Sequence, residues 1–132
     1  MKSDNILTIT SLLAIVLMSL HLTDDVVRGI EPGGLENLIG VLILTVWLYA
    51  TLVLARRRWG YAILLLGSIF AALMPVIHLS GEGVGGEFTT SRGAFFSIWM
   101  LIALGVTGTF SLVLSARGLW SPRANASKAG RP

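Results

Sequence analysis

Two histidines and the carboxylates that follow them carry most of the chemistry this 132-residue sequence could perform. His21 is followed by Asp24 and Asp25, three and four residues later. In an α-helix these spacings place side chains on one face, so the three residues would form a single polar ridge. A second histidine, His78, is followed four residues later by Glu82. Imidazole nitrogens and carboxylate oxygens are ligands that Zn²⁺ takes in proteins, so the pattern points to metal chemistry.

Three kinds of site are consistent with these residues, provided that the two segments meet in space. The candidate ligands of a divalent metal are His21, Asp24, Asp25, His78 and Glu82. The two imidazoles alone could instead be the axial ligands of one haem held between two helices. A histidine–carboxylate set beside a cavity is also typical of a proton or cation path. If the segments stay apart, the residues are ordinary interfacial side chains, with Asp24 and Arg28 as an i,i+4 ion pair.

The elements that must position these side chains are indicated by composition. Hydrophobic residues make up 54% of the chain and charged residues 13%, about half the charge of ordinary soluble domains. A small domain needs more charge than this to cover its surface in water, so we exclude a soluble globular enzyme and a disordered protein. The chain has no cysteine, which excludes disulfides, thiolate metal sites and cysteine nucleophiles.

Four apolar blocks are long enough to cross a bilayer as helices, and none contains Asp, Glu, Lys or Arg. The predicted spans are residues 6–22, 38–55, 59–79 and 94–116. Most tryptophans and tyrosines lie toward block ends, as at headgroup level, although Trp47 lies deeper. The expected fold is an all-α integral membrane protein, with four transmembrane helices in an up-down bundle over residues 1–120. The polar and basic residues 121–132 are expected to form a disordered tail.

The charges between the blocks predict the orientation of the helices. One side of a four-span chain would carry eight Lys and Arg residues and one acid, and the other side two basic residues and six acids. By the positive-inside rule both termini are expected to be cytoplasmic in a multi-pass protein of the cell membrane. The first and third spans then end in the same leaflet, which places His21 and His78 near the outer interface. The net charge of +3 is thus a topology signal, and we expect the lipid bilayer as a partner but no nucleic acid.

Small and weakly polar residues align on one face of each predicted span. Such faces favour close helix packing in lipid, where apolar side chains gain nothing by leaving the acyl chains. The residues that share a face are Thr10, Ala14 and His21; Asn37, Gly40 and Thr51; Gly60, Gly67, Ala71 and His78; and Ser97, Gly108, Ser111 and Ser115. We therefore expect these four faces to point inward.

The function expected from these patterns is that of a non-enzymatic accessory or assembly subunit of a membrane complex, bound to other membrane chains or to itself. The basis for this expectation is that little of the chain lies outside the predicted spans. The alternatives are a membrane-embedded metal-dependent hydrolase, in which Asp25 or Glu82 is the base, and a single-haem electron carrier that uses His21 and His78. A small proton or cation transporter is a further alternative.

Overall fold

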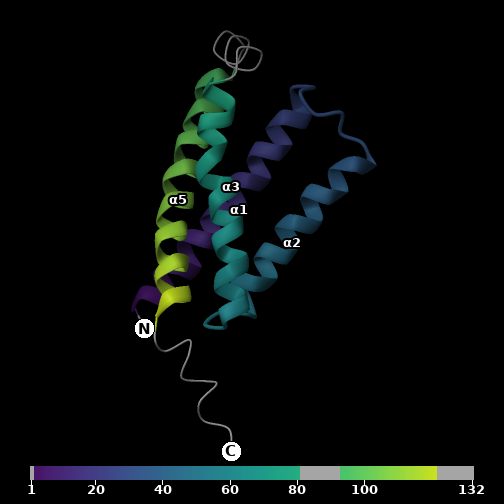
Figure 1. Cartoon of the computed structure of the whole chain (residues 1–132). Coiled ribbons are helices and arrows are strands. Elements are labelled where there is room, and N and C mark those ends of the chain that lie inside the picture. Colours follow the sequence, from purple (N-terminus) through teal and green to yellow (C-terminus); the bar gives the residue numbers. More distant parts are fainter. Residues whose placement is uncertain (1, 81–92, 122–132) are drawn as a thin grey trace, which may run out of the picture.

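The computed structural model describes residues 2–80 and 93–121, and every regular element within them is helical (Figure 1). The elements are α1 (Lys2–Val27), the short 3-10 helix η1 (Leu35–Asn37), α2 (Leu38–Leu52), α3 (Arg58–Ser80) and α5 (Ala94–Trp120). Consecutive long helices run in opposite directions, so the N-terminus and the last described residues lie at the same end. Glu82, residues 81–92 as a whole and the predicted tail from residue 122 lie outside the described residues.

All four long helices have the length and composition needed to cross a membrane. Their most apolar 18-residue windows have mean hydropathies from 1.7 to 2.3, and at most 33% of any window is buried within the protein. Large apolar side chains such as Leu42, Phe70 and Phe110 are therefore exposed, which suits a surface covered by acyl chains. The predicted all-helical chain with four helices of spanning length is confirmed, and it indicates a membrane location.

Most helix boundaries differ from the predicted spans, by one to five residues, and two of these differences bear on the site and on the packing. Helix α1 continues past the apolar block to Val27, so the polar ridge that starts at His21 lies on helical backbone. Helix α2 ends at Leu52, before the predicted residue 55, and a tight turn through Arg56 at φ 70° leads into α3. Gly60, in the first turn of α3, lies against this connection: a Cβ there would overlap the carbonyl group of Leu54, so the close approach requires glycine.

Helices α3 and α5 form the most extensive contact in the described part of the chain and lie side by side in Figure 1. Glycine makes this approach close, since a Cβ at Gly108 would lie 2.7 Å from the Ala71 Cβ. One turn along, the Ser68 hydroxyl donates to Ser111 Oγ at 2.8 Å, and both side chains are buried, so a hydrogen bond joins the two helices inside the protein. Helix α1 packs on the other side of α5.

Helix α2 is joined to α1 by a buried polar network around Trp47. The Trp47 Nε1–H donates to Ser11 Oγ at 3.0 Å, and Ser11 Oγ lies 2.8 Å from Thr51 Oγ1. The indole lies against Gly67 of α3, where a Cβ would come 2.5 Å from the ring. Trp47 is therefore a core residue with 2% exposure, whereas the sequence predicted only that it lies deeper than the block ends.

The prediction that small residues mark the inward faces is confirmed for most of them. Ala14, Thr51, Ala71, Ser97, Gly108, Ser111 and Ser115 are buried. Thr10 is only partly buried, and its hydroxyl donates to the Leu7 carbonyl of its own helix. Close packing at small residues is the interaction available to helices in lipid, which explains why the faces that carry these residues predict burial.

Gly108→Val tests the close packing of α3 on α5. The two added methyl groups and the Cβ must displace Ala71 or the backbone of Ala72, whose nitrogen would lie 2.7 Å from the new Cβ. Overpacking of this kind typically costs about 1–3 kcal/mol, so we expect a lower free energy of unfolding in mild detergent. The matched control is Thr109→Val, which places valine on the adjacent exposed position of the same helix and should change stability much less. Equal losses in the two variants would contradict the packing described here.

Candidate metal centre

His21 and Asp25 lie one turn apart near the end of α1 and are both buried. His21 is 1% exposed and Asp25 is 4% exposed, although charged residues seldom lie so deep without partners. The His21 Nε2 atom lies 3.4 Å from Asp25 Oδ2. The i,i+4 spacing of the sequence produces this pair directly, because helical residues four apart stand one above the other.

His78 reaches the same carboxylate from α3. Its Nε2 atom lies 3.9 Å from Asp25 Oδ2, and its ring meets the His21 ring edge to face, with centroids 4.6 Å apart and planes at 81°. The two segments of the chain that carry histidine therefore meet in space. Together His21, Asp25 and His78 form the His–Asp–His cluster, whose ligand atoms all lie within 4.8 Å of one another.

The hydrogen bond of the other His78 nitrogen suits a metal ligand. Nδ1 lies 3.1 Å from the carbonyl oxygen of Met74. A carbonyl only accepts, so in the neutral ring Nδ1 carries the proton and Nε2, the atom nearer Asp25, has the lone pair. Metal-ligating histidines commonly donate their second N–H to a backbone carbonyl in this way.

Two polar atoms of the cluster are buried without a hydrogen-bond partner among the described residues. They are Nδ1 of His21 and Oδ1 of Asp25. An unsatisfied buried polar atom typically costs about 1–3 kcal/mol, and such atoms are rare in folded proteins. A bound cation or water in contact with either atom would remove that atom's share of this cost, so the unpartnered atoms are a second observation that points to a ligand.

The cluster fits a small divalent ion better than it fits a haem. A tetrahedral ion with bonds of about 2 Å keeps its ligands a little over 3 Å apart. The two histidine–carboxylate pairs, at 3.4 and 3.9 Å, are close to this separation, and the widest pair, within 4.8 Å, would have to close further. Axial haem ligands face each other across the iron with the whole porphyrin between them. The edge-to-face contact of His21 and His78 leaves no room for that plane. The described geometry therefore argues against the haem alternative.

Asp24 belongs to a different set of contacts. Its Oδ2 atom accepts a hydrogen bond from Arg28 Nε at 2.8 Å and another from the Ser97 hydroxyl of α5 at 2.6 Å. Gly93, at the start of α5, lies so close to Arg28 that a Cβ there would come 2.9 Å from the guanidinium. Asp24 thus joins α1 to α5, and the i,i+4 pair expected as the alternative to metal binding is the arrangement observed. It is not part of the His–Asp–His cluster.

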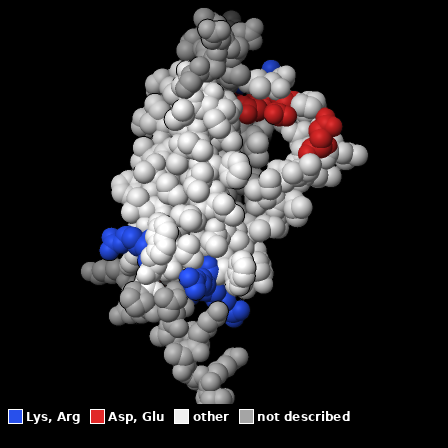
Figure 2. Space-filling model, in the orientation of Figure 1, with Lys and Arg blue, Asp and Glu red and all other residues white. Residues whose placement is uncertain are grey.

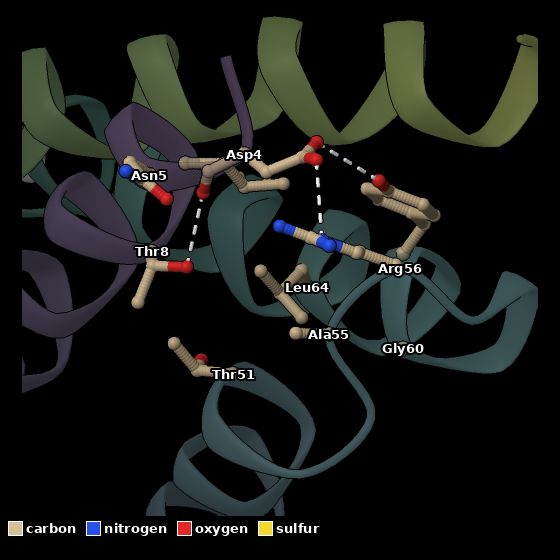
Figure 3. Close-up of a pocket in the computed structure, with 10 residues that line it drawn as sticks. Asp4, Asn5, Thr8, Thr51, Ala55, Arg56, Gly60 and Leu64 are labelled. Carbon is tan, nitrogen blue, oxygen red and sulfur yellow. Dashed lines mark hydrogen bonds and ion pairs between the residues drawn. The ribbon is translucent and has the colours of Figure 1, made fainter. Parts of the chain in front are cut away.

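A pocket at the opposite end of the molecule, lined by both apolar and polar residues, was not anticipated from the sequence (Figure 3). It has a volume of about 240 Å³ and lies between the start of α1 and the α2–α3 turn. The Asp4 carboxylate makes the polar contacts of this pocket: its Oδ2 atom lies 3.3 Å from Arg56 Nε, and its Oδ1 atom accepts a hydrogen bond from the Tyr61 hydroxyl at 3.3 Å. These partners satisfy the Asp4 carboxylate, so the pocket offers less binding capacity than the His–Asp–His cluster.

The sequence did not predict that Ser97 and Asp24 are hydrogen-bond partners. It placed Ser97 on the inward face of its helix but could not name Asp24 as its partner, since the two residues lie 73 positions apart.

A scan against protein-family models and searches of the curated proteins and of the solved structures found no match for this chain. The site is therefore interpreted from its own geometry.

Ser97→Ala tests whether Asp24 ties α1 to α5. The substitution removes a hydrogen bond to a charged acceptor, which is typically worth about 1.5–3 kcal/mol, and leaves the helix backbone unchanged. We expect the free energy of unfolding in detergent to fall by that amount. The control is Ser19→Ala, which removes only a bond to the Ile15 carbonyl of its own helix. If Ser97→Ala is equally costly in an Asp24→Asn background, the two side chains are not coupled.

Proposed function

We propose that this chain is a small multi-pass membrane protein that binds one divalent transition-metal ion, of the Zn²⁺ type, at the His–Asp–His cluster. The observation that carries the proposal is the meeting of two histidines and a carboxylate, from two helices, at a buried point with two unpartnered polar atoms. Two imidazoles and one carboxylate are a set that Zn²⁺ takes in catalytic sites, where a fourth position stays open to water or substrate.

We further propose that the cluster lies in the outer leaflet and that both termini are cytoplasmic. The support is the separation of charge along the molecule: acidic residues gather at the end that carries the α1–α2 connection, and most described Lys and Arg residues gather at the other end (Figure 2). The acids are Asp24, Asp25, Glu31 and Glu36. Basic loops stay on the cytoplasmic side during insertion, so the acidic end faces out.

The absence of charged side chains along the four predicted spans favours metal binding over proton transport. No Asp, Glu, Lys, Arg or His occurs in residues 5–20, 38–55, 59–77 or 94–116, so the sequence offers no charged relay across the hydrocarbon core. The accessory role expected from composition depends on a partner chain, whereas the cluster is a specific feature of this chain itself. A metal at this place could stabilise such a subunit or activate water. Three ligands from the described residues would leave a fourth position for water, which supports the second role.

Labelling of single cysteines tests the proposed orientation, and the absence of native cysteine makes the experiment clean. Gly34→Cys introduces an exposed thiol between α1 and α2, and Arg57→Cys introduces one in the α2–α3 turn. In intact cells a membrane-impermeant maleimide should label the first variant at once. It should label the second only after permeabilisation. The reverse pattern would place the cluster on the cytoplasmic side.

Metal affinity of purified protein, measured by calorimetry with Zn²⁺ and by elemental analysis, tests the cluster. The wild type should bind one ion, and His21→Ala, Asp25→Ala and His78→Ala should each lower the affinity by about 100-fold or more, because each removes a direct ligand. The matched control is Asp24→Asn, which changes the neighbouring carboxylate but no ligand.

A pH titration distinguishes this site from adventitious binding by surface carboxylates. Imidazole ligands must be neutral to bind, so affinity should fall steeply between about pH 7 and pH 5 in the wild type. Substoichiometric binding, or equal affinity in the wild type and in His78→Ala, would overturn the proposal.

A further inference from the structure

An apolar cleft lies between α1, α2 and α3 and is not explained by metal binding. Its volume is about 230 Å³, and only apolar residues line it, with Met18 and Leu22 from α1, Gly40 and Trp47 from α2, and Met74 from α3 among them. Apolar cavities of this size stay free of water and accept apolar ligands. The cleft is only partly enclosed and lies beside α2, the least buried of the four long helices.

Two residues that line the cleft lie about one helical turn before the two histidines of the His–Asp–His cluster. Met18 precedes His21 by three residues on α1, and Met74 precedes His78 by four residues on α3. These are same-face spacings, and they correspond to about 4.5 and 6 Å along a helix axis. Met74 also holds His78 directly, since its carbonyl oxygen accepts from His78 Nδ1. A ligand that fills the cleft would therefore end within about one helical turn of the metal.

The charge of the loaded site determines which end of a ligand it would attract. A divalent ion carries two positive charges, and Asp25 supplies one negative charge, while Asp24 and Arg28 neutralise each other at 2.8 Å. The two imidazoles bind as neutral ligands. The ion and its three protein ligands thus carry a net charge of about +1 in a low-dielectric region, and the Glu31 carboxylate is a further charge that interacts with Asp25. An anionic oxygen is favoured as the remaining ligand because it would bond directly to the ion.

We propose that the cleft binds one acyl chain of a membrane amphiphile with an anionic head, and that the head completes the coordination of the metal at the His–Asp–His cluster. The inference rests on the proposed metal site and names the class of ligand for its open position. Acyl chains are the apolar molecules that surround α1, α2 and α3 if these helices span a bilayer. The cleft admits the chain because Gly40 has no side chain to close it.

Trp47 is a built-in reporter for this proposal, because it lines the cleft and is only 2% exposed. The other tryptophans, Trp59, Trp99 and Trp120, are 63–78% exposed and are replaced by phenylalanine. The protein is then titrated in unbrominated detergent with a fatty acid brominated near mid-chain, which quenches indole fluorescence on contact. We expect saturable quenching of Trp47 with about tenfold higher affinity in Zn²⁺ than in chelator, because the metal binds the carboxylate.

A brominated fatty alcohol of the same chain length tests the role of the head. It should quench Trp47 with an affinity that does not depend on Zn²⁺, since its head is neutral. The Zn²⁺ effect on the fatty acid should disappear in His78→Ala, which excludes complexes formed in solution. Zn²⁺ dependence that is equal for acid and alcohol, or that survives His78→Ala, would overturn the coordination of the head.

Gly40→Phe tests the cleft itself, because a first side-chain carbon fits there at 3.4 Å from Leu22 and the ring would occupy the cavity. Quenching should weaken about tenfold, whereas Ile39→Phe, on the adjacent exposed position, should leave it unchanged. Stoichiometric Zn²⁺ binding by Gly40→Phe shows that this variant is folded. Equal quenching in the two variants, or none in wild-type background with Zn²⁺ bound, overturns the inference and leaves the metal site standing. Failure of the wild type to bind Zn²⁺ overturns the proposed function instead.

Discussion

Close packing of helix backbones at small residues is the interaction on which the rest of this structure depends. Apolar side chains gain little by packing together in lipid, so helices associate where glycine, alanine and serine let them approach and form hydrogen bonds. Gly108 against Ala71, with the Ser68–Ser111 hydrogen bond beside it, joins α3 and α5 in this way. Helix α1 then docks on the same α5.

The position of the His–Asp–His cluster follows from this packing. Helices α1 and α3 both rest on α5, and their own mutual contact is much smaller. Within that contact His21 and His78 touch, with ring centroids 4.6 Å apart. Asp24 holds the same end of α1 to α5 through its hydrogen bond with Ser97, so the two adjacent aspartates make different contacts. Asp24 joins α1 to α5, and Asp25 lies next to the two histidines.

Helix α2 contributes differently, since it is the least buried of the four long helices. Trp47 donates a hydrogen bond to Ser11 and lies against Gly67, whereas at Gly40 only the Leu22 side chain comes within 4 Å of where a Cβ would lie. A looser helix beside a buried polar cluster is the arrangement that an amphiphile-binding site needs. It provides lateral access from the acyl chains, whereas the cluster provides the polar end.

The sequence by itself determined the four helices of membrane-spanning length and composition and most of their inward faces, because length, hydropathy and the spacing of small residues are local properties of each helix. It also determined the His21–Asp25 pair, since i,i+4 neighbours meet in any helix. Only the tertiary structure decided that His78 joins this pair and that Asp24 does not. Asp24 and Asp25 lie on the same broad face of α1 as His21. Helix α5 packs against one edge of this face and provides Ser97 for Asp24, whereas α3 packs against the other edge and provides His78 for Asp25. That choice depends on distant contacts, such as Ser97 with Asp24, which no periodicity within a single helix encodes.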